Sequence, residues 1–159
     1  RYSDPIENLA RMFLVNECDV EETLRFLTAP NDVIHRVVSA IRAYDEAMFV
    51  DDERIMRYNI YRFGEKAMRR AISMRDDLEN RGDIRRAFET TVASGNPMFK
   101  RDLVIDGNDI KALGFEGKMI GHAYECAMNV VLDNPKNNNR EILLPFLEKI
   151  LYPTVNPTL

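Results

Sequence analysis

The segment 102–144 constrains the fold most, because it contains two short polar turns that each precede a helical pattern. The first turn, Asp106-Gly107-Asn108-Asp109, offers Asp and Asn side chains that can cap the amides of a following helix. That helix must be short, since Leu113-Gly114 ends it and Gly114 suits the left-handed residue just after a helix end. The turn at 115–117 then leads into a second, longer helix.

The longer helix buries one face, because its apolar residues recur at spacings of three and four. These residues are Ile120, Ala123, Tyr124, Ala127, Val130 and Val131. Asn134-Pro135 ends this helix, and a last helix follows from about Asn138. Its predicted inward residues are Ile142, Leu143, Phe146, Leu147, Ile150 and Leu151.

Upstream of this segment, caps and apolar spacing predict further helices. Asp4 caps a helix through about Asn16, with Pro5 in its first turn. Asp19 caps a short second helix, and Asn31 caps a long third one. The predicted buried residues are Ile6, Leu9, Met12 and Phe13 in the first helix and Val33, Val37, Ile41, Tyr44 and Met48 in the third.

The segment 52–80 predicts one or two helices broken at Phe63-Gly64, and 81–94 predicts another. The one β-like run, Leu103-Val104-Ile105, is three residues long, so we expect an extended connector there rather than a strand. We therefore predict an all-α protein without significant sheet, built as one multi-helix bundle or as two small helical lobes. The composition, with 45% hydrophobic and 30% charged residues, is that of a globular protein.

The segment 102–144 resembles the C-terminal region of bacterial tRNA nucleotidyltransferases, the CCA-adding enzymes, and of the related poly(A) polymerases. Those proteins carry the pattern D-L-x-I-x-G-x-D-L-x-x-L-G, then G-P-x-I-G, an apolar helix, an asparagine and a Leu-Leu pair. The matching positions are Asp102, Leu103, Ile105, Gly107, Asp109, Leu113, Gly114, Gly117, Ile120, Gly121, Asn139, Leu143 and Leu144. The chain departs from the pattern at Lys118, where the family usually has proline, and at Ala127-Met128, where it has Leu-Leu.

The resemblance covers most of residues 20–150, less specifically before residue 100. Residues 23–34 look like the family's helix, Pro-Asn turn and helix, and residues 55–64 look like its linker helix. Relatives with an HD-type metal domain have a His-Asp pair where this chain has Ala43-Tyr44-Asp45. On this basis residues 1–97 correspond to a helical body-like region and residues 98–159 to the family's tail domain.

The family's catalytic head is marked by a Gly-Ser turn and an Asp-x-Asp pair that holds two magnesium ions. No such arrangement occurs in this sequence. The resemblance therefore implies a non-catalytic C-terminal region of a longer enzyme, with no catalytic residue, metal or cofactor of its own. It implies that the parent enzyme uses Mg and ATP or CTP, and that the partners are tRNA and the N-terminal catalytic head.

Charge is unevenly distributed along the chain. Residues 54–101 hold 12 basic and 6 acidic residues, a balance of +6, whereas the whole chain carries −4. Phosphate contacts depend on such charge and on shape rather than on base identity. With the resemblance, we expect RNA contacts among Arg62, Lys66, Arg69, Arg70, Arg81, Arg85, Arg86, Lys100, Arg101 and Lys118.

Each of these features has a second interpretation. From charge alone, arginine-rich helix faces are more often solvated and paired with nearby carboxylates. At Gly117-Lys118-Met119-Ile120-Gly121, a helix N-terminus and an ammonium could bind a phosphate. We favour instead that Gly117 makes a turn and that Gly121 lets helices approach closely. Tyr58, Tyr61 and Phe63 could stack on a base, but at helical spacing we favour core packing.

Two rival functional classes remain. A helical protein-interaction or dimerisation module would explain the amphipathic helices without any RNA. An HD-type phosphohydrolase needs several His and Asp ligands, and the sequence has two histidines and no His-Asp dipeptide. No apolar run approaches the roughly 20 residues that span a bilayer, so we expect a cytoplasmic protein.

Overall fold

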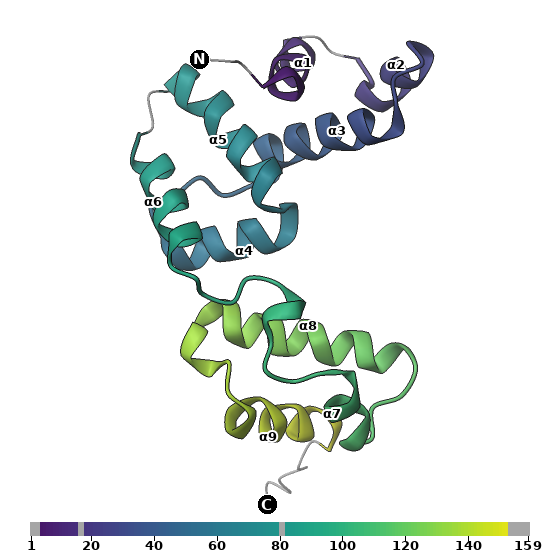
Figure 1. Ribbon diagram of the computed structural model, residues 1–159, viewed down its shortest axis with the longest axis vertical. Helices are drawn as coiled ribbons and strands as arrows, with labels where there is room; N and C mark the ends of the chain where they lie inside the picture. The colour runs from purple at the N-terminus through teal and green to yellow at the C-terminus, as the bar shows by residue number, and fades with distance from the viewer. Residues whose placement is uncertain (1–3, 16–17, 80–81, 153–159) are drawn as a thin grey trace, which may run out of the picture. The chain divides into compact units, whose positions relative to one another are not determined.

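The computed structural model describes residues 4–15, 18–79 and 82–152, and for residues 76–79 it describes the backbone alone (Figure 1). These residues form α-helices, two short 3-10 helices and no strand, which confirms the predicted all-α class. The chain divides into two compact units, Arg1–Ser94 and Gly95–Leu159. Unit 1 and unit 2 are described separately below.

Unit 1 is built from six described helices that pack mainly on α3 and α5. They are α1 (Pro5–Leu14), α2 (Val20–Phe26), α3 (Asn31–Glu46), α4 (Glu53–Phe63), α5 (Glu65–Glu79) and α6 (Gly82–Ala93). Helix α3 packs against α1, α2, α4 and α5, and α6 packs against α4 and α5. One core cluster joins Ile6, Ala10, Leu24, Ile34, Val37, Ala40 and Met74.

Aspartates cap the first helices of unit 1, as predicted. Asp4 Oδ1 accepts from the amide of Ile6 at 2.9 Å, and Asp19 Oδ1 accepts from the amide of Glu22 at 2.7 Å. The prediction for Asn31 is wrong, because Pro30 occupies the cap position and makes no side-chain bond. Asn31 is the first helical residue instead.

Two predicted core methionines of unit 1 are exposed. Met12 is 64% exposed because α1 buries the face that carries Ile6 and Ala10, and Met12 lies off that face. Met48 is 59% exposed because α3 ends at Glu46, where the backbone turns extended, so the stripe does not reach it. The predicted break at Phe63-Gly64 is confirmed, and Gly64 with φ +85° separates α4 from α5.

Unit 2 contains three described α-helices and two 3-10 helices. They are η1 (Lys100–Asp102), α7 (Gly107–Ala112), α8 (Lys118–Asp133), η2 (Pro135–Asn137) and α9 (Arg140–Leu151). Its core cluster joins Ile105, Ile110, Phe115, Ala123, Ala127, Val131, Leu143 and Leu147. Of the residues predicted to face inward in α9, Ile142 is 42% exposed, because Leu143 and Leu147 centre the buried face. Met128 and Leu132, which the spacing missed, are buried.

The two predicted turns of unit 2 are confirmed. Asp106 Oδ1 accepts from the amides of Asn108 and Asp109, at 2.8 and 3.0 Å. Asp109 Oδ2 in return accepts from the amide of Asp106 at 3.0 Å, which completes a capping box. Gly114 has φ +104° and Gly117 has φ +52°, the left-handed region that only glycine adopts without strain.

Polar side chains, rather than pairing with a strand, fix the position of the connector 103–105. Asn138 Oδ1 accepts from the amide of Val104 at 3.0 Å, and Asn138 Nδ2 donates to the carbonyl of Asp102 at 2.8 Å. Arg140 Nη1 donates to Asp109 Oδ2 at 2.7 Å, and Arg140 Nη2 bonds the other oxygen of the same carboxylate. The start of α9 is thus tied to both the connector and the α7 cap.

Candidate nucleic-acid interface

The predicted phosphate-binding residues fall on three helices of unit 1 and on unit 2, and most of them have a partner. Arg69 of α5 bonds Glu89 of α6 at 2.5 Å and Glu65 of its own helix at 3.2 Å. Its guanidinium also lies over the Phe88 ring, 4.8 Å from the centroid. Burial lowers the pKa of Arg69, but the hydrogen bonds and charges of Glu89 and Glu65 outweigh it and raise that pKa above its ordinary value.

Arg62, near the end of α4, pairs with α3. Its Nη2 lies 2.5 Å from Glu46 Oε2, and its guanidinium lies 4.8 Å from the centroid of the Phe63 ring. Glu46 also accepts from Arg42 Nε at 3.0 Å, so one carboxylate serves two arginines. Among the ion pairs of the described residues, Arg42 and Arg62 therefore share a single carboxylate.

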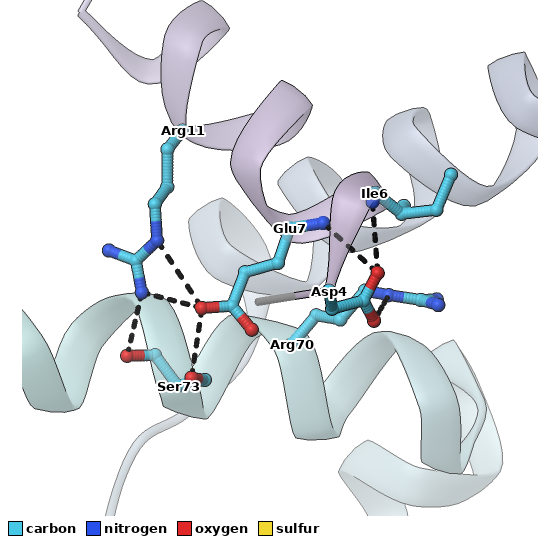
Figure 2. Close-up of polar contacts among 6 residues, drawn as sticks. All are labelled: Asp4, Ile6, Glu7, Arg11, Arg70 and Ser73. Atoms are coloured by element: carbon cyan, nitrogen blue, oxygen red, sulfur yellow. Dashed lines mark hydrogen bonds and ion pairs between the residues drawn. The ribbon is translucent and has the colours of Figure 1, made fainter. Parts of the chain in front are cut away.

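Arg70 lies within a polar seam between α1 and α5 (Figure 2). Its Nε donates to Asp4 Oδ2 at 2.7 Å, and only 14% of its side chain is exposed. Next to it, Glu7 Oε1 accepts from Arg11 Nη2 at 2.7 Å and from Ser73 Oγ at 2.9 Å (Figure 2). Arg70 thus joins two helices, and a phosphate would have to displace Asp4 to reach it.

Burial raises the pKa of Asp4, but the hydrogen bond from Arg70 and the amides of Ile6 and Glu7 outweigh it. The net result is a pKa below the ordinary value for aspartate. Asp4 is therefore charged in the folded protein at neutral pH, both as a cap and as a partner of Arg70.

Lys66 of α5 and Arg86 of α6 differ from these residues. Both side chains are exposed, and neither has a hydrogen bond, ion pair or ring contact with any residue that the structure describes. Arg85 is half-buried and takes part in a contact of its own. Arg81 lies outside the described residues.

In unit 2, two of the three predicted cations have partners. Lys100 pairs with Glu125 of α8, and Arg101 lies over the Phe99 ring at 4.6 Å from the centroid. Lys118, the first residue of α8, is exposed and without a partner in the described part of the chain. Gly117 makes the predicted turn there, but Gly121 does not bring helices together, because a Cβ built on it meets nothing within 4 Å.

Three polar residues of α4 and α5 have structural roles that the sequence did not reveal. Asn59 is 6% exposed and binds both backbone groups of Met48, donating to the carbonyl at 2.8 Å and accepting from the amide at 3.4 Å. Arg75 donates to the carbonyl of Tyr44 at 3.0 Å, and its guanidinium lies over both the Tyr44 and the Phe49 rings. Arg57 is 6% exposed. Part of the positive balance of 54–101 is therefore inside unit 1.

The aromatic residues of α4 lie at the edge of its packing. Tyr58, Tyr61 and Phe63 are all half-buried, which fits neither a fully exposed stacking platform nor a fully buried core. Their neighbours Met56 and Ile60, both at 0% exposure, form the buried face of α4.

Among the residues described, no three His, Cys, Asp or Glu side chains gather in a group that could hold a metal ion. None of the described helices has the length and apolar character that crossing a membrane requires.

Fold and charge together define a two-unit, all-α protein with exposed cations on a pair of packed helices, α5 and α6. The chain matches no protein-family model, and no curated protein or solved structure proves similar to it. Its membership of the nucleotidyltransferase family therefore stays a prediction from the segment 102–144.

Proposed function

We propose that this chain is the non-catalytic, RNA-binding C-terminal region of a cytoplasmic tRNA nucleotidyltransferase. In this role it grips a folded tRNA so that the 3′ end reaches a catalytic head, which would bind Mg and the nucleotide. The observation that carries the proposal is a pair of exposed cations on the neighbouring helices α5 and α6, Lys66 and Arg86, for which the described residues provide no ion-pair partner.

Such a surface suits recognition by shape. A-form RNA exposes phosphates and 2′-hydroxyls along a shallow minor groove, and a rigid helical surface with spaced cations can bind them without reading bases. Helices α5 and α6 are held together by packing and by the Arg69–Glu89 ion pair, so the backbone positions that carry Lys66 and Arg86 are fixed relative to each other. In unit 2, Lys118 offers a further exposed cation that has no partner among the residues whose structure is described.

The motif in segment 102–144, on which the family resemblance depends, includes residues that have structural roles. Asp106 and Asp109 form the capping box, Gly114 and Gly117 adopt left-handed backbone, and Leu143 is fully buried. A pattern made of such residues specifies a fold, which is why it supports a tail domain and says nothing of a reaction.

Binding of a tRNA transcript across a salt series tests the proposal. We expect the logarithm of the binding constant to fall linearly with the logarithm of salt concentration. We also expect Lys66→Glu/Arg86→Glu to weaken binding. The matched control is Lys136→Glu/Lys149→Glu, which makes the same change in net charge at exposed positions of unit 2 that were not predicted to bind RNA. No binding at low salt, or equal loss in both variants, would contradict the proposal.

A second candidate is a protein-interaction module, favoured by the C-terminal end of α2. Phe26 is 86% exposed and Leu27 is 62% exposed, and large apolar residues exposed together are typical of contact surfaces. Sedimentation of the protein over a range of concentrations tests self-association. If the protein dimerises, Phe26→Ser/Leu27→Ser should make it monomeric, and a monomer at every concentration would rule out dimerisation.

A further inference from the structure

Lys66 and Arg69 of α5 and Arg86 of α6 lie in different charge environments, although the sequence predicts the same phosphate-binding role for all three. We propose that Arg69 is not a phosphate ligand: it holds Glu65 and Glu89 in ion pairs, and this leaves Lys66 and Arg86 to make the phosphate contacts. The inference rests on the proposed function and assigns separate roles within that surface.

Arg69 is already occupied. Its Nη1 bonds Glu89 and its Nη2 bonds Glu65, while the face of its guanidinium covers the Phe88 ring. The single positive charge of Arg69 lies against two carboxylates, so its guanidinium has no net positive charge left to offer a phosphate.

The two carboxylates that Arg69 holds lie on the same two helices as Lys66 and Arg86, for which the described residues provide no partner. Glu89 lies three residues after Arg86 in α6, a spacing that puts two side chains on one helix face, whereas Glu65 and Lys66 are adjacent in α5 and point in different directions. Asp83, three residues before Arg86, is engaged in a contact of its own. Arg69 holds Glu65 and Glu89, and in the described structure neither of them pairs with Lys66 or Arg86.

The two roles predict different results when the carboxylates are removed together with Arg69. If Arg69 only holds them, Arg69→Gln alone leaves two carboxylates unpaired on the α5–α6 surface and weakens RNA binding. The triple variant Glu65→Gln/Arg69→Gln/Glu89→Gln then restores binding, and its salt slope equals that of the wild type. If Arg69 is a phosphate ligand, both variants lose one contact, and the slope of log binding constant against log salt becomes shallower by about 0.7 to 0.9 in both.

The experiment is a titration of a tRNA transcript with the full 159-residue chain at several salt concentrations. We expect Arg69→Gln to bind more weakly than the wild type and the triple variant to bind at least as tightly as the wild type, because it removes two negative charges and one positive charge. Lys66→Gln/Arg86→Gln should make the negative slope of log binding constant against log salt shallower by about 1.4 to 1.8, the value for two lost phosphate contacts.

Each outcome decides between the two roles. A triple variant as weak as Arg69→Gln, or an unchanged slope in Lys66→Gln/Arg86→Gln, overturns the inference while leaving RNA binding intact. A wild-type chain that shows no salt-dependent binding contradicts the proposed function itself. Circular dichroism at 222 nm, a general measure of helix content, checks that each variant folds. Lys66 and Arg86 have no described partners, so their variant keeps the test valid even if the triple variant unfolds.

Discussion

At the scale of single residues, two aspartates of this protein each cap a helix and also bind an arginine of another helix. Asp4 caps α1 and binds Arg70 of α5, while Asp109 completes the α7 capping box and binds Arg140 of α9. Each therefore ties a helix end to a distant element, so that one substitution affects local and tertiary structure together. The capping role of each aspartate follows from the local sequence. The arginine partner does not, because it lies 66 residues from Asp4 and 31 residues from Asp109.

Asp4→Ala should destabilise unit 1 by about 1–2 kcal/mol, because it removes a helix cap and leaves Arg70 without its carboxylate. Urea denaturation measures the change. Asp19→Ala is the matched control, since Asp19 is a cap in an exposed setting and binds no arginine in the described structure. An effect at Asp4 no larger than the effect at Asp19 would show that the bond to Arg70 contributes nothing.

The Asp109–Arg140 pair should make the stability of unit 2 depend on pH in the acid range. The hydrogen bond from Arg140, followed by that from the Asp106 amide, holds the pKa of Asp109 below its ordinary value. A lowered folded-state pKa adds stability above the unfolded-state pKa, and this stability is lost as pH falls through the folded-state value. Arg140→Gln should therefore lower Tm at pH 7 and lower it less in acid; an equal difference at both pH values would contradict this.

At the scale of elements, glycines end some helices and merely occupy others. Gly64 has φ +85° between α4 and α5, so Gly64→Ala should destabilise unit 1 by about 1–2 kcal/mol. Gly121 lies inside α8 with open space around it, so Gly121→Ala should stabilise unit 2 by roughly 0.5–1 kcal/mol. Thermal denaturation of the two variants distinguishes these roles by opposite signs.

Helix boundaries were the most predictable part of the fold, because caps and glycine stops act over a few residues. Asp4, Asp19, Asp106 and Gly64 were all placed correctly. Burial was less predictable, since Ile142 satisfies the helical spacing and still faces outward. Which side of an apolar stripe is covered depends on neighbouring helices, and spacing alone does not contain that information.

The sequence predicts how many basic residues the segment 54–101 contains, but it does not predict which of them are exposed and without an ion-pair partner. The sequence locates twelve cations in 54–101, but it does not show that the guanidinium of Arg75 lies over two rings or that Arg62 and Arg70 pair with distant carboxylates. The Arg69–Glu65 pair, at a spacing of four, is the kind that sequence can anticipate. Unpaired cations emerge only after the tertiary pairs are known.

At the scale of the whole molecule, unit 2 has a core cluster of its own. Leu143 lies fully buried in the unit 2 cluster, which contains no residue of unit 1. Leu143→Ala should destabilise unit 2 by about 2–5 kcal/mol. We expect hydrogen exchange to accelerate in α8 and α9 while α3 and α5 keep their protection. Faster exchange in all four helices would indicate a single cooperative unit instead.

The bonding of Asn138 makes unit 2 sensitive to chemical ageing. Its amide nitrogen donates to the carbonyl of Asp102 while its oxygen accepts from Val104. Deamidation would replace the donor with a second oxygen and set a carboxylate against a carbonyl. A stored sample would then lose the tie between the connector and the start of α9 without any change in the genetic sequence.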